Sequence, residues 1–553
     1  MSIEQRDRKF ALKWSAILLA MLLFPYLLLW LLTPKGSNYT GLLFNPSDTF
    51  LYYSQMFHSH LGPWQFTDYF TYLREPQLAI YGLYSLLGRF LPGSASIGSI
   101  ALVFHLSRIL LAVLFLWQAW LFYKEVLANR ISKRIGFLFL LFTSGMAIFQ
   151  LLIPILNSPS PPFDLLITES SSFSGLLYAP HFAAVLFLLV TCARYSYKAF
   201  LSDSKPHLFR SLFIASISSL FLSTIHPDKI GVLIIALALY VLWTLYRQEF
   251  KNWSIIWKAA LIISPSIPYL LFSYNLTVSD PQIQALIQQG LPHESVSQPL
   301  LYYGFGFGIP LICALVGLPR ILKNLKESAS GEIYLWSFVI AGFIIIFLPF
   351  KNVGHRGEGL QLFLAALAGR NLTLLILPKF WKSRFFNFCK RKKLFGYSRR
   401  KLRLLSINLV IIISASSVMA LTFSSPRGAL AGVPEIYISQ QDEDALYWIR
   451  QNVSSNDTIV GEPISDEYIA AFSGAHAAWG SWSYTPNYNN EGNHLRQFFL
   501  GQEDPHKYLT SRGIKWFYFG PRERQVTKFT PSTFSYLREA YHNSQIVIYK
   551  VSQ

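Results

Sequence analysis

Residues 14–32 read WSAILLAMLLFPYLLLWLL, a stretch without a single charged side chain. A helix of about 20 apolar residues crosses the roughly 30 Å hydrocarbon core of a bilayer. Similar runs recur along most of the 553 residues, of which 52% are hydrophobic and only 14% are charged, with a mean hydropathy of +0.34. This pattern predicts an α-helical polytopic membrane protein.

The apolar runs predict about 11 transmembrane helices. The first follows four basic residues and has the length of a retained helix, with no small-residue cleavage site of a signal peptide after it. The expected segments are Trp14–Leu32, Ile97–Tyr123, Ile135–Leu156, Leu176–Ala193, Ser211–Ile225, Ile230–Tyr246, Ala259–Tyr274, Leu301–Leu318, Ile333–Phe350, Leu360–Leu377 and Leu404–Phe423.

The distribution of basic residues predicts which side each loop faces. With a cytoplasmic N-terminus, 29 lysines and arginines fall on the inner side and only six in the outer loops. Basic residues concentrate in cytoplasmic loops, so the net charge of +19 reflects topology rather than nucleic-acid binding. We expect a multi-pass protein of the cytoplasmic membrane whose C-terminal region is extracytoplasmic.

Two domains are expected. Residues 1–423 form the transmembrane domain, with a large first outer loop at 33–96, and residues 424–553 form a small extracytoplasmic α/β domain. In the latter, we predict helices over Asp442–Gln451 and Pro505–Arg512, and strands over Thr458–Val460, Ile514–Phe519 and Ile546–Val551. Helices that alternate with strands are typical of such domains.

Cysteines and nucleotide motifs point to no particular chemistry. The three cysteines, Cys192, Cys313 and Cys389, fall in or beside predicted membrane helices or in a cytoplasmic loop, so the exported regions have no disulfide framework. The sequence has no CxxC spacing, no P-loop and no strand-GxGxxG-helix unit. The pattern GFGFG at 304–308 is better explained by helix packing than by phosphate binding.

The first outer loop contains the leading candidate for a catalytic residue. Asp48 lies in the stretch NPSDTFLYY at 45–53, at the start of a probable amphipathic helix over Thr49–Ser59. Ser47 or Asp48 could also simply cap that helix. Aromatic and polar residues surround this acid in the sequence, and they also fit an ordinary interfacial belt: Tyr52, Tyr53, His58, Trp64, Asp68 and Tyr69.

Three further outer loops carry ionisable residues on the same predicted face of the membrane. The second loop contains Asp164 and Glu169 and leads into His181. The third contains the stretch HPDK at 226–229, with His226 and Lys229, and the fifth contains HRGE at 355–358, with Arg356. We predict that these loops converge on one site, although outer loops must be polar in any case.

These residue types suit the transfer of a group from a phosphate. A carboxylate such as Asp48 can accept a proton from an acceptor hydroxyl, and Asp164 and Glu169 provide a second acidic element. Arg356 can bind phosphate through its planar donors, with His181, His226 and Lys229 assisting. Asp48, Asp164 or Glu169 could also hold a divalent metal, Mg²⁺ or Mn²⁺.

Ionisable residues also occur inside the predicted helices. His105 and Arg108 lie three residues apart in the second segment, and Arg370 lies in the tenth. Such residues are costly in a bilayer and are functional candidates by default, but Arg108 can instead pair with a backbone carbonyl.

The layout and short motifs resemble the GT-C superfamily of multi-pass glycosyltransferases, which includes protein O-mannosyltransferases, lipid A aminoarabinose transferases and the catalytic subunit of oligosaccharyltransferase. The motif SDTFLYY at 47–53 is similar to their acidic first-loop motif. The block from Asp164 and Glu169 to Pro180-His181-Phe182 resembles uncharacterised bacterial members. The tail stretches 448–450, 480–486 and 513–524 are similar to the C-terminal region of the same proteins.

The resemblance implies an inverting glycosyltransferase that takes a sugar from a polyprenyl phosphate in the membrane and transfers it to a glycan, lipid or protein acceptor. Two other classes of function stay open. A transporter or flippase of lipid-linked glycans would distribute polar groups along the helices. A non-catalytic polysaccharide-assembly protein would tolerate replacement of Asp48.

Overall fold

The computed structural model describes residues 2–62, 64, 67–73, 82–146, 148–149, 163–202, 204–290, 300–348, 354–391 and 398–552. The chain folds into two compact units. The helical unit comprises Met1–Pro25, Arg108–Phe272 and Glu294–Ser424, and the mixed unit comprises Tyr26–Ser107, Ser273–His293 and Ser425–Gln553. The mixed unit thus joins the C-terminal region to most of the expected first outer loop, and the expected boundary at residue 423 stays a prediction.

Long apolar helices confirm a polytopic membrane protein. Among the described residues, nine helices are long and apolar enough to cross a membrane, or ten if one bent pair counts as a span. Apart from that pair, they are α1 (Ile3–Leu31), α4 (Ile97–Val126), α9 (Pro180–Leu201), α10 (Lys205–Ile225), α11 (Asp228–Arg247), the Ser254–Ser279 run of α12 (Ser254–Ile263) and α13 (Ile267–Ser279), α15 (Leu300–Lys323), α16 (Ser330–Phe347), and the Leu360–Lys382 run of α17 (Leu360–Asn371) and α18 (Leu377–Lys382).

Two of the expected segments differ from simple spans. The last expected helix is the bent pair α20 (Arg399–Ser414) and α21 (Ser416–Gly432), whose axes differ by 46°. The third, expected over Ile135–Leu156, appears as the shorter helix α5 (Arg130–Phe142), and the last residues of the expected segment lie outside the described ranges.

Helix α17 lies at the centre of the helical unit. Almost all of its side chains are buried, and it packs against α5, α15 and α16. The close approach to α5 depends on glycine: a Cβ on Gly369 would lie 2.3 Å from the backbone nitrogen of Gly136. Small residues of this kind allow helix backbones to pack closely in membranes.

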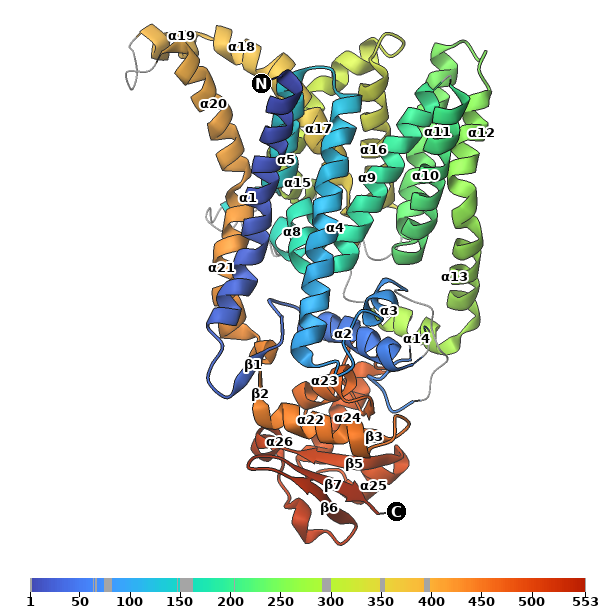
Figure 1. Ribbon diagram of the computed structural model, residues 1–553, viewed down its shortest axis with the longest axis vertical. Helices are drawn as coiled ribbons and strands as arrows, with labels where there is room; N and C mark the ends of the chain where they lie inside the picture. The colour runs from blue at the N-terminus through green and yellow to red at the C-terminus, as the bar shows by residue number, and fades with distance from the viewer. Residues whose placement is uncertain are drawn as a thin grey trace. The chain divides into compact units, whose positions relative to one another are not determined.

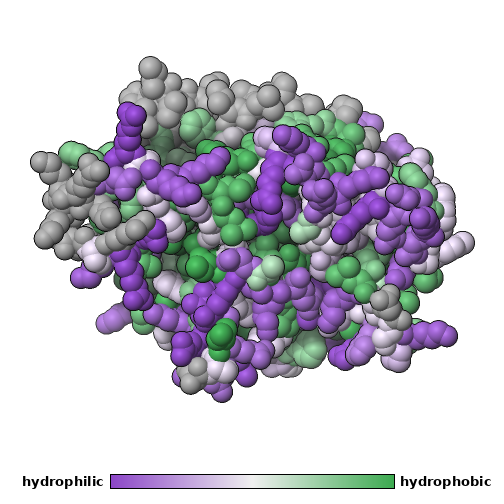
Figure 2. Space-filling view, turned by 90° about the horizontal axis from the view of Figure 1, so that it is seen from above, coloured by the Kyte–Doolittle hydropathy of each residue, from purple (hydrophilic) through white to green (hydrophobic). Residues whose placement is uncertain are grey.

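Basic loops meet at one end of the helical unit. Asp7 of α1 binds Arg130 and Arg134 at 2.7 and 2.6 Å, and Glu125 binds Arg194 at 2.7 Å. The N-terminus, α18 and α19 (Arg384–Arg391) lie at this end (Figure 1). Figure 2 shows the molecule from the same end, where hydrophilic side chains cover much of the visible face. These contacts confirm that loops expected on one side of the membrane lie together.

In the mixed unit, the first-loop helix α2 (Pro46–Leu61) packs against α3 (Gly82–Gly88) and against α23 (Pro463–Phe472) of the C-terminal region. The hydroxyl of Ser54 donates to the carbonyl of Ala470, and the backbone of Ala477 donates to that of Tyr69. A short antiparallel ladder pairs β1 (Ser37–Tyr39) with β2 (Tyr437–Ser439). The first outer loop and the tail therefore form one folded body.

A five-stranded mixed sheet organises the tail. Its order is β4-β3-β5-β7-β6, with β4 (His476–Ala477), β3 (Thr458–Val460) and β5 (Ile514–Phe519) parallel to one another. The strands β7 (Val547–Val551) and β6 (Leu537–His542) continue it antiparallel. Helices α22 (Gln440–Asn452), α24 (Tyr488–Phe499), α25 (Pro505–Ser511) and α26 (Pro521–Val526) accompany the strands. All five elements predicted in the tail are confirmed to within two residues.

The Gly136–Gly369 contact predicts a strong effect of a single methyl group. Gly369→Ala should destabilise the protein by about 1–3 kcal/mol, because the added carbon meets backbone atoms of α5 that cannot rotate away. Gly304→Ala is the matched control, since the space around Gly304 is open. Thermal unfolding of both variants in detergent measures the difference, and equal midpoints would contradict this close packing.

Candidate functional site

Four ionisable side chains meet where membrane-spanning helices of the helical unit end. His226 follows the last residue of α10, and Asp228 and Lys229 form the first turn of α11. Glu358 follows the short 3₁₀ helix η5 (Gly354–Gly357), two residues before α17 begins. The loop HPDK and the loop HRGE therefore meet, as the sequence predicted for two of its outer loops.

Lys229 and His226 both face carboxylates. The ammonium of Lys229 lies 2.7 Å from an oxygen of Asp228 and 3.9 Å from Oε2 of Glu358. Nδ1 of His226 lies 3.5 Å from Asp228 and 3.7 Å from Glu358. Because the Lys229 side chain is completely buried, these acids are needed to offset the cost of its charge.

Glu358 is the least satisfied member of the group. Its side chain is buried, and neither carboxylate oxygen receives a hydrogen bond from the described part of the chain. Burial raises the pKa of Glu358 to about 7, against the opposing charges of His226 and Lys229. This carboxyl group can therefore gain or lose a proton near neutral pH.

His226 has the opposite balance. Burial alone would lower its pKa, but the carboxylates of Glu358 and Asp228 outweigh burial and raise it. The imidazolium form is thereby favoured, and the side chain keeps 18% of its surface exposed. The ring of His181, at the start of α9, stacks on that of His226 at 5.6 Å with an angle of 10° between the planes.

Glu169 belongs to the same neighbourhood. It lies in the 3₁₀ helix η2 (Thr168–Ser170), which packs against η5, and its charge acts on both Lys229 and Glu358. Thr168 donates to its carboxylate at 2.6 Å. The structure therefore brings Glu169, His181, His226 and Lys229 together, whereas Asp164 has other partners.

Arg356 lies in η5 beside this cluster, and its guanidinium donates to the carbonyl of Ile345 at 3.4 Å. The side chain of the neighbouring His355 lies outside the described part of the structure. Gln361, in the first turn of α17, accepts from the backbone of Ser172 and donates to the carbonyl of Thr143. It thereby fixes the loop that carries Glu169.

Asp164 has a different setting. It lies in α7 (Phe163–Leu166), is fully buried, and accepts from the backbone of Gly145 at 2.7 Å and from Ser144 at 3.2 Å. Gly145 leaves no room for a Cβ, because the carbonyls of Phe305 and Gly306 lie 2.3 Å from where it would stand. The GFGFG stretch thus packs against the backbone that holds Asp164. Burial raises the pKa of this acid to about 6.

Asp48 lies in the mixed unit, in the first turn of α2. The N-cap of α2 is Asn45, with a left-handed φ of 51° and no side-chain capping bond, so neither Ser47 nor Asp48 occupies the N-cap position. The side-chain amide of Asn45 donates to the carboxylate of Asp48 at 2.6 Å. Asp48 keeps part of its surface exposed.

Glu467 of α23 is the acidic neighbour of Asp48 that the sequence reading missed. Burial raises its pKa to about 8, and the charges of Glu435, Glu462 and Asp48 add to that shift. A carboxyl group whose pKa is raised in this way holds its proton near neutral pH and so adds no charge beside the other acids. The sequence feature that could have pointed to Glu467 is the pair of acids, Asp466 and Glu467, inside an otherwise largely apolar helix.

Most of the aromatic residues near Asp48 pack inside the mixed unit, whereas Trp64 is exposed. Tyr52 stacks on Tyr84 at 4.4 Å, and Tyr53 is completely buried. His58 stacks on Tyr69 at 3.3 Å, and burial lowers the pKa of His58 to about 3. These contacts hold α2, and with it Asp48, in a fixed place within the mixed unit.

The residues named as metal ligands do not form a ligand set in the described structure. Over the described ranges, no group of three or more His, Cys, Asp or Glu side chains is arranged to hold a metal ion. Asp164 is engaged by Ser144 and Gly145, away from the partners of Glu169. The divalent metal expected from the sequence stays a prediction.

The ionisable residues inside the helices have structural partners. Arg108 donates to the carbonyls of Leu176 and Leu177 at 2.8 and 3.0 Å, at the end of α8 (Ser172–Tyr178). Arg370 pairs with Glu332 of α16 at 2.5 Å, and His105 bonds the carbonyl of Gly41 at 2.9 Å. These contacts give each of the three side chains a role in packing the helices.

Comparison with solved structures identifies the fold. An oligosaccharyltransferase of Archaeoglobus fulgidus, tethered to an acceptor peptide, aligns with 92% of this chain and 69% of its own, at 13% identity and a TM-score of 0.53. The archaeal oligosaccharyltransferase AglB from the same organism was solved in complex with an inhibitory peptide and a dolichol-phosphate. Its alignment covers 93% of this chain and 69% of AglB, at 14% identity and a TM-score of 0.50. The alignment with ArnT from Cupriavidus metallidurans bound to undecaprenyl phosphate covers 97% of this chain and 98% of ArnT, at 12% identity and a TM-score of 0.49.

No protein-family model matches the chain, and no curated protein resembles it in sequence. The likeness therefore rests on structure. The chain shares the fold of the archaeal oligosaccharyltransferase, and the GT-C-like fold expected from its sequence is confirmed.

The buried charges predict a large cost for removing Lys229. Lys229→Met should destabilise the protein by roughly 3–5 kcal/mol, because it removes the fully buried cation that Asp228 and Glu358 share and leaves them only the longer contacts to His226. Adding Glu358→Gln should recover part of the loss. Lys251→Met is the control, since Lys251 is exposed and its surface pair with Glu249 is worth about 0–1 kcal/mol. Chemical unfolding in detergent measures all three variants, and equal losses would refute this account.

The carboxylate of Glu358 should set the pKa of His226. Glu358→Gln should lower it, because burial then acts with less opposition from a carboxylate. Histidine-specific NMR titration of the protein in lipid nanodiscs follows the ring directly, with Glu539→Gln on an exposed strand as the control. An unchanged or higher pKa in Glu358→Gln would show that Glu358 does not set the charge of His226.

Proposed function

We propose that this chain is an integral-membrane glycosyltransferase that moves a sugar from a polyprenyl-phosphate donor to an acceptor on the extracytoplasmic face of a cell membrane. The observation that carries the proposal is the fold shared with an oligosaccharyltransferase solved with an acceptor peptide and with a dolichol-phosphate. The cluster of charged residues at the helix ends is consistent with such a reaction, because phosphate is the leaving group of the donor.

In this proposal the helical unit binds the donor phosphate. His226 is favoured as an imidazolium and partly exposed, and Arg356 supplies a planar guanidinium in the adjacent loop. Both can stabilise the negative charge that grows on the phosphate as its bond to the sugar breaks. Lys229, held by two carboxylates, and His181, stacked on His226, act mainly by positioning that ring.

Asp48 takes the proton of the acceptor. An acceptor hydroxyl or amide attacks the anomeric carbon, the bond from that carbon to the phosphate oxygen breaks, and polyprenyl phosphate leaves. Asp48 suits the base because it is partly exposed and lies next to Glu467, whose raised pKa lets it hold a proton and reduce the repulsion between the two acids.

Asp164 and Glu169 act as positioning residues. Asp164 fixes the backbone at Ser144 and Gly145, and Glu169 adds negative charge beside Lys229. The basic end of the helical unit faces the cytoplasm in this proposal, following the usual bias of basic loops. The cluster at His226 then opens to the opposite side, where a lipid carrier presents its sugar.

Transfer by purified protein in lipid tests the proposal. We expect wild type to release or transfer sugar from at least one member of a panel of radiolabelled polyprenyl-phosphate sugars. Asp48→Asn should reduce turnover at least 100-fold with donor binding retained, because it keeps the shape and removes the base. His226→Gln should weaken donor binding as well as turnover.

Asp504→Asn provides the control for Asp48→Asn, since Asp504 caps α25 in the tail at an exposed position. Equal turnover in wild type and Asp48→Asn would remove Asp48 from the mechanism. Absence of turnover with every donor, in protein that folds and binds lipid, would count against a glycosyltransferase.

A further inference from the structure

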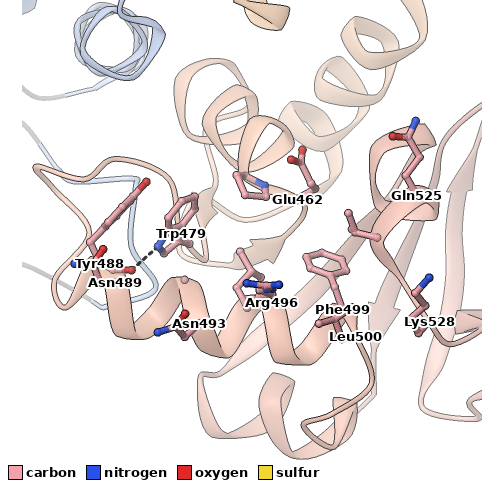
Figure 3. A pocket seen from close by; sticks show the side chains of 14 residues that line it. Glu462, Trp479, Tyr488, Asn489, Asn493, Arg496, Phe499, Leu500, Gln525 and Lys528 are labelled. Atoms are coloured by element: carbon pink, nitrogen blue, oxygen red, sulfur yellow. Dashed lines mark hydrogen bonds between the residues drawn. The ribbon is translucent and has the colours of Figure 1, made fainter.

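A pocket of about 630 Å³ opens in the mixed unit, apart from Asp48, at the ends of the parallel strands (Figure 3). Glu462 follows β3 by two residues, Trp479 follows β4 by two, and Gln525 lies in the helix that follows β5. The carboxyl ends of all three parallel strands therefore contribute to the pocket. Helix α24 supplies much of the remaining wall.

The position of the pocket in the sheet is one where α/β domains bind ligands. From β3 the chain passes to β4 on one side, and it then returns past β3 to β5 on the other side. Ligands bind in the crevice outside the carboxyl ends of the strands at such a reversal of strand order.

One wall of the pocket is aromatic. The ring of Trp479 stacks on Tyr488 at 4.4 Å with 22° between the planes, and its Nε1 donates to the carbonyl of Tyr488 at 2.9 Å. The hydrogen bond drawn in Figure 3 fixes the indole at the edge of the pocket. Phe499 and Leu500 extend the apolar surface. A flat apolar wall of this kind packs against the C–H face of a sugar ring.

The polar groups around that wall suit hydroxyls. Asn489 and Asn493 stand four residues apart on α24, and so share one face of the helix. Gln525 lies across the pocket (Figure 3). Each side-chain amide offers both a donor and an acceptor, which is what a hydroxyl requires of its partners.

The backbone amides that usually bind a nucleotide phosphate in such a sheet already donate to protein carboxylates. Helix α23 starts after β3, and its N-terminal amide at Ile464 donates to the carboxylate of Glu462 at 3.1 Å. After β5, the backbone of Gly520 donates to Glu523 at 2.8 Å. Protein carboxylates thus occupy the backbone amides that would otherwise bind phosphate, which argues against a nucleotide.

Two cations line the pocket together with one carboxylate, that of Glu462, which already accepts a hydrogen bond from the backbone of Ile464. Arg496 lies three residues after Asn493 on α24, and Lys528 follows α26. Within the described ranges neither side chain makes an ion pair, and both are exposed. An anionic substituent on a bound sugar would find its partner here.

We propose that this pocket binds a saccharide that carries a carboxylate, with its ring against Trp479 and its acidic group toward Arg496 and Lys528. The further step, that this saccharide is the acceptor, rests on the proposed glycosyltransfer. Binding itself does not depend on that activity.

The test measures binding by the full-length protein in nanodiscs, without any donor. Calorimetric titration compares oligosaccharides of hexuronic acids with their carboxyl-reduced, uncharged forms. We expect wild type to bind at least one acidic probe about tenfold more tightly than its reduced form. Arg496→Gln should remove that preference, and Asn493→Trp should abolish binding of both forms by filling the pocket. Arg538→Gln, on the exposed face of β6, should behave as wild type.

Each other result overturns the inference. Absence of saturable binding with every probe excludes a saccharide site, and unchanged binding by Asn493→Trp places the saccharide elsewhere. Equal affinity for acidic and reduced forms refutes the role of the cations. Donor turnover is measured on the same wild-type sample, which separates the two proposals. Binding without turnover contradicts the glycosyltransferase, and turnover without binding contradicts this pocket.

Discussion

The helical unit depends on the neutralisation of a buried lysine at the end of its helices. Lys229 has no exposed surface, and Asp228 and Glu358, which come from two different loops, offset the cost of burying its charge. That requirement ties the turn between α10 and α11 to the start of α17. The same two acids act on His226, so one arrangement of charge both closes the fold and sets the protonation of the residue that we assign to the donor phosphate.

Much of the fold could be predicted because its signals are local. Apolar length and the bias of basic residues predicted the spans and their common basic end. The largely apolar run that Gly520-Pro521 closes predicted the buried strand Ile514–Phe519. The two-residue strand β4 is too short to leave a pattern, and β6 carries Arg538, Glu539 and His542 along an edge, where charge is tolerated. Helix α5 was expected to be longer because apolar residues continue beyond Phe142, where the described helix ends.

The candidate site was only partly predictable, since proximity in space depends on contacts between distant residues. The sequence singled out His226 and Lys229 as polar residues in an outer loop, but it could not show that Glu358 would be their buried partner. Asp164 and Glu169 looked equivalent in one loop, yet Asp164 turned toward the backbone at Gly145. Glu467 was missed because its helix reads as ordinary core, and only the tertiary structure places it beside Asp48.

The packing of α5 against α17 has a consequence for biosynthesis. Ser132 bonds Thr373 across 241 residues of chain, and α5 itself has only 13 residues, too few to cross a bilayer alone. At a synthesis rate of 5–20 residues per second, α5 must wait roughly 10–50 s before its partner leaves the ribosome. During that interval the face of α5 that contains Gly136 cannot pack against α17. Lipid or the insertion machinery must cover that face until α17 is inserted.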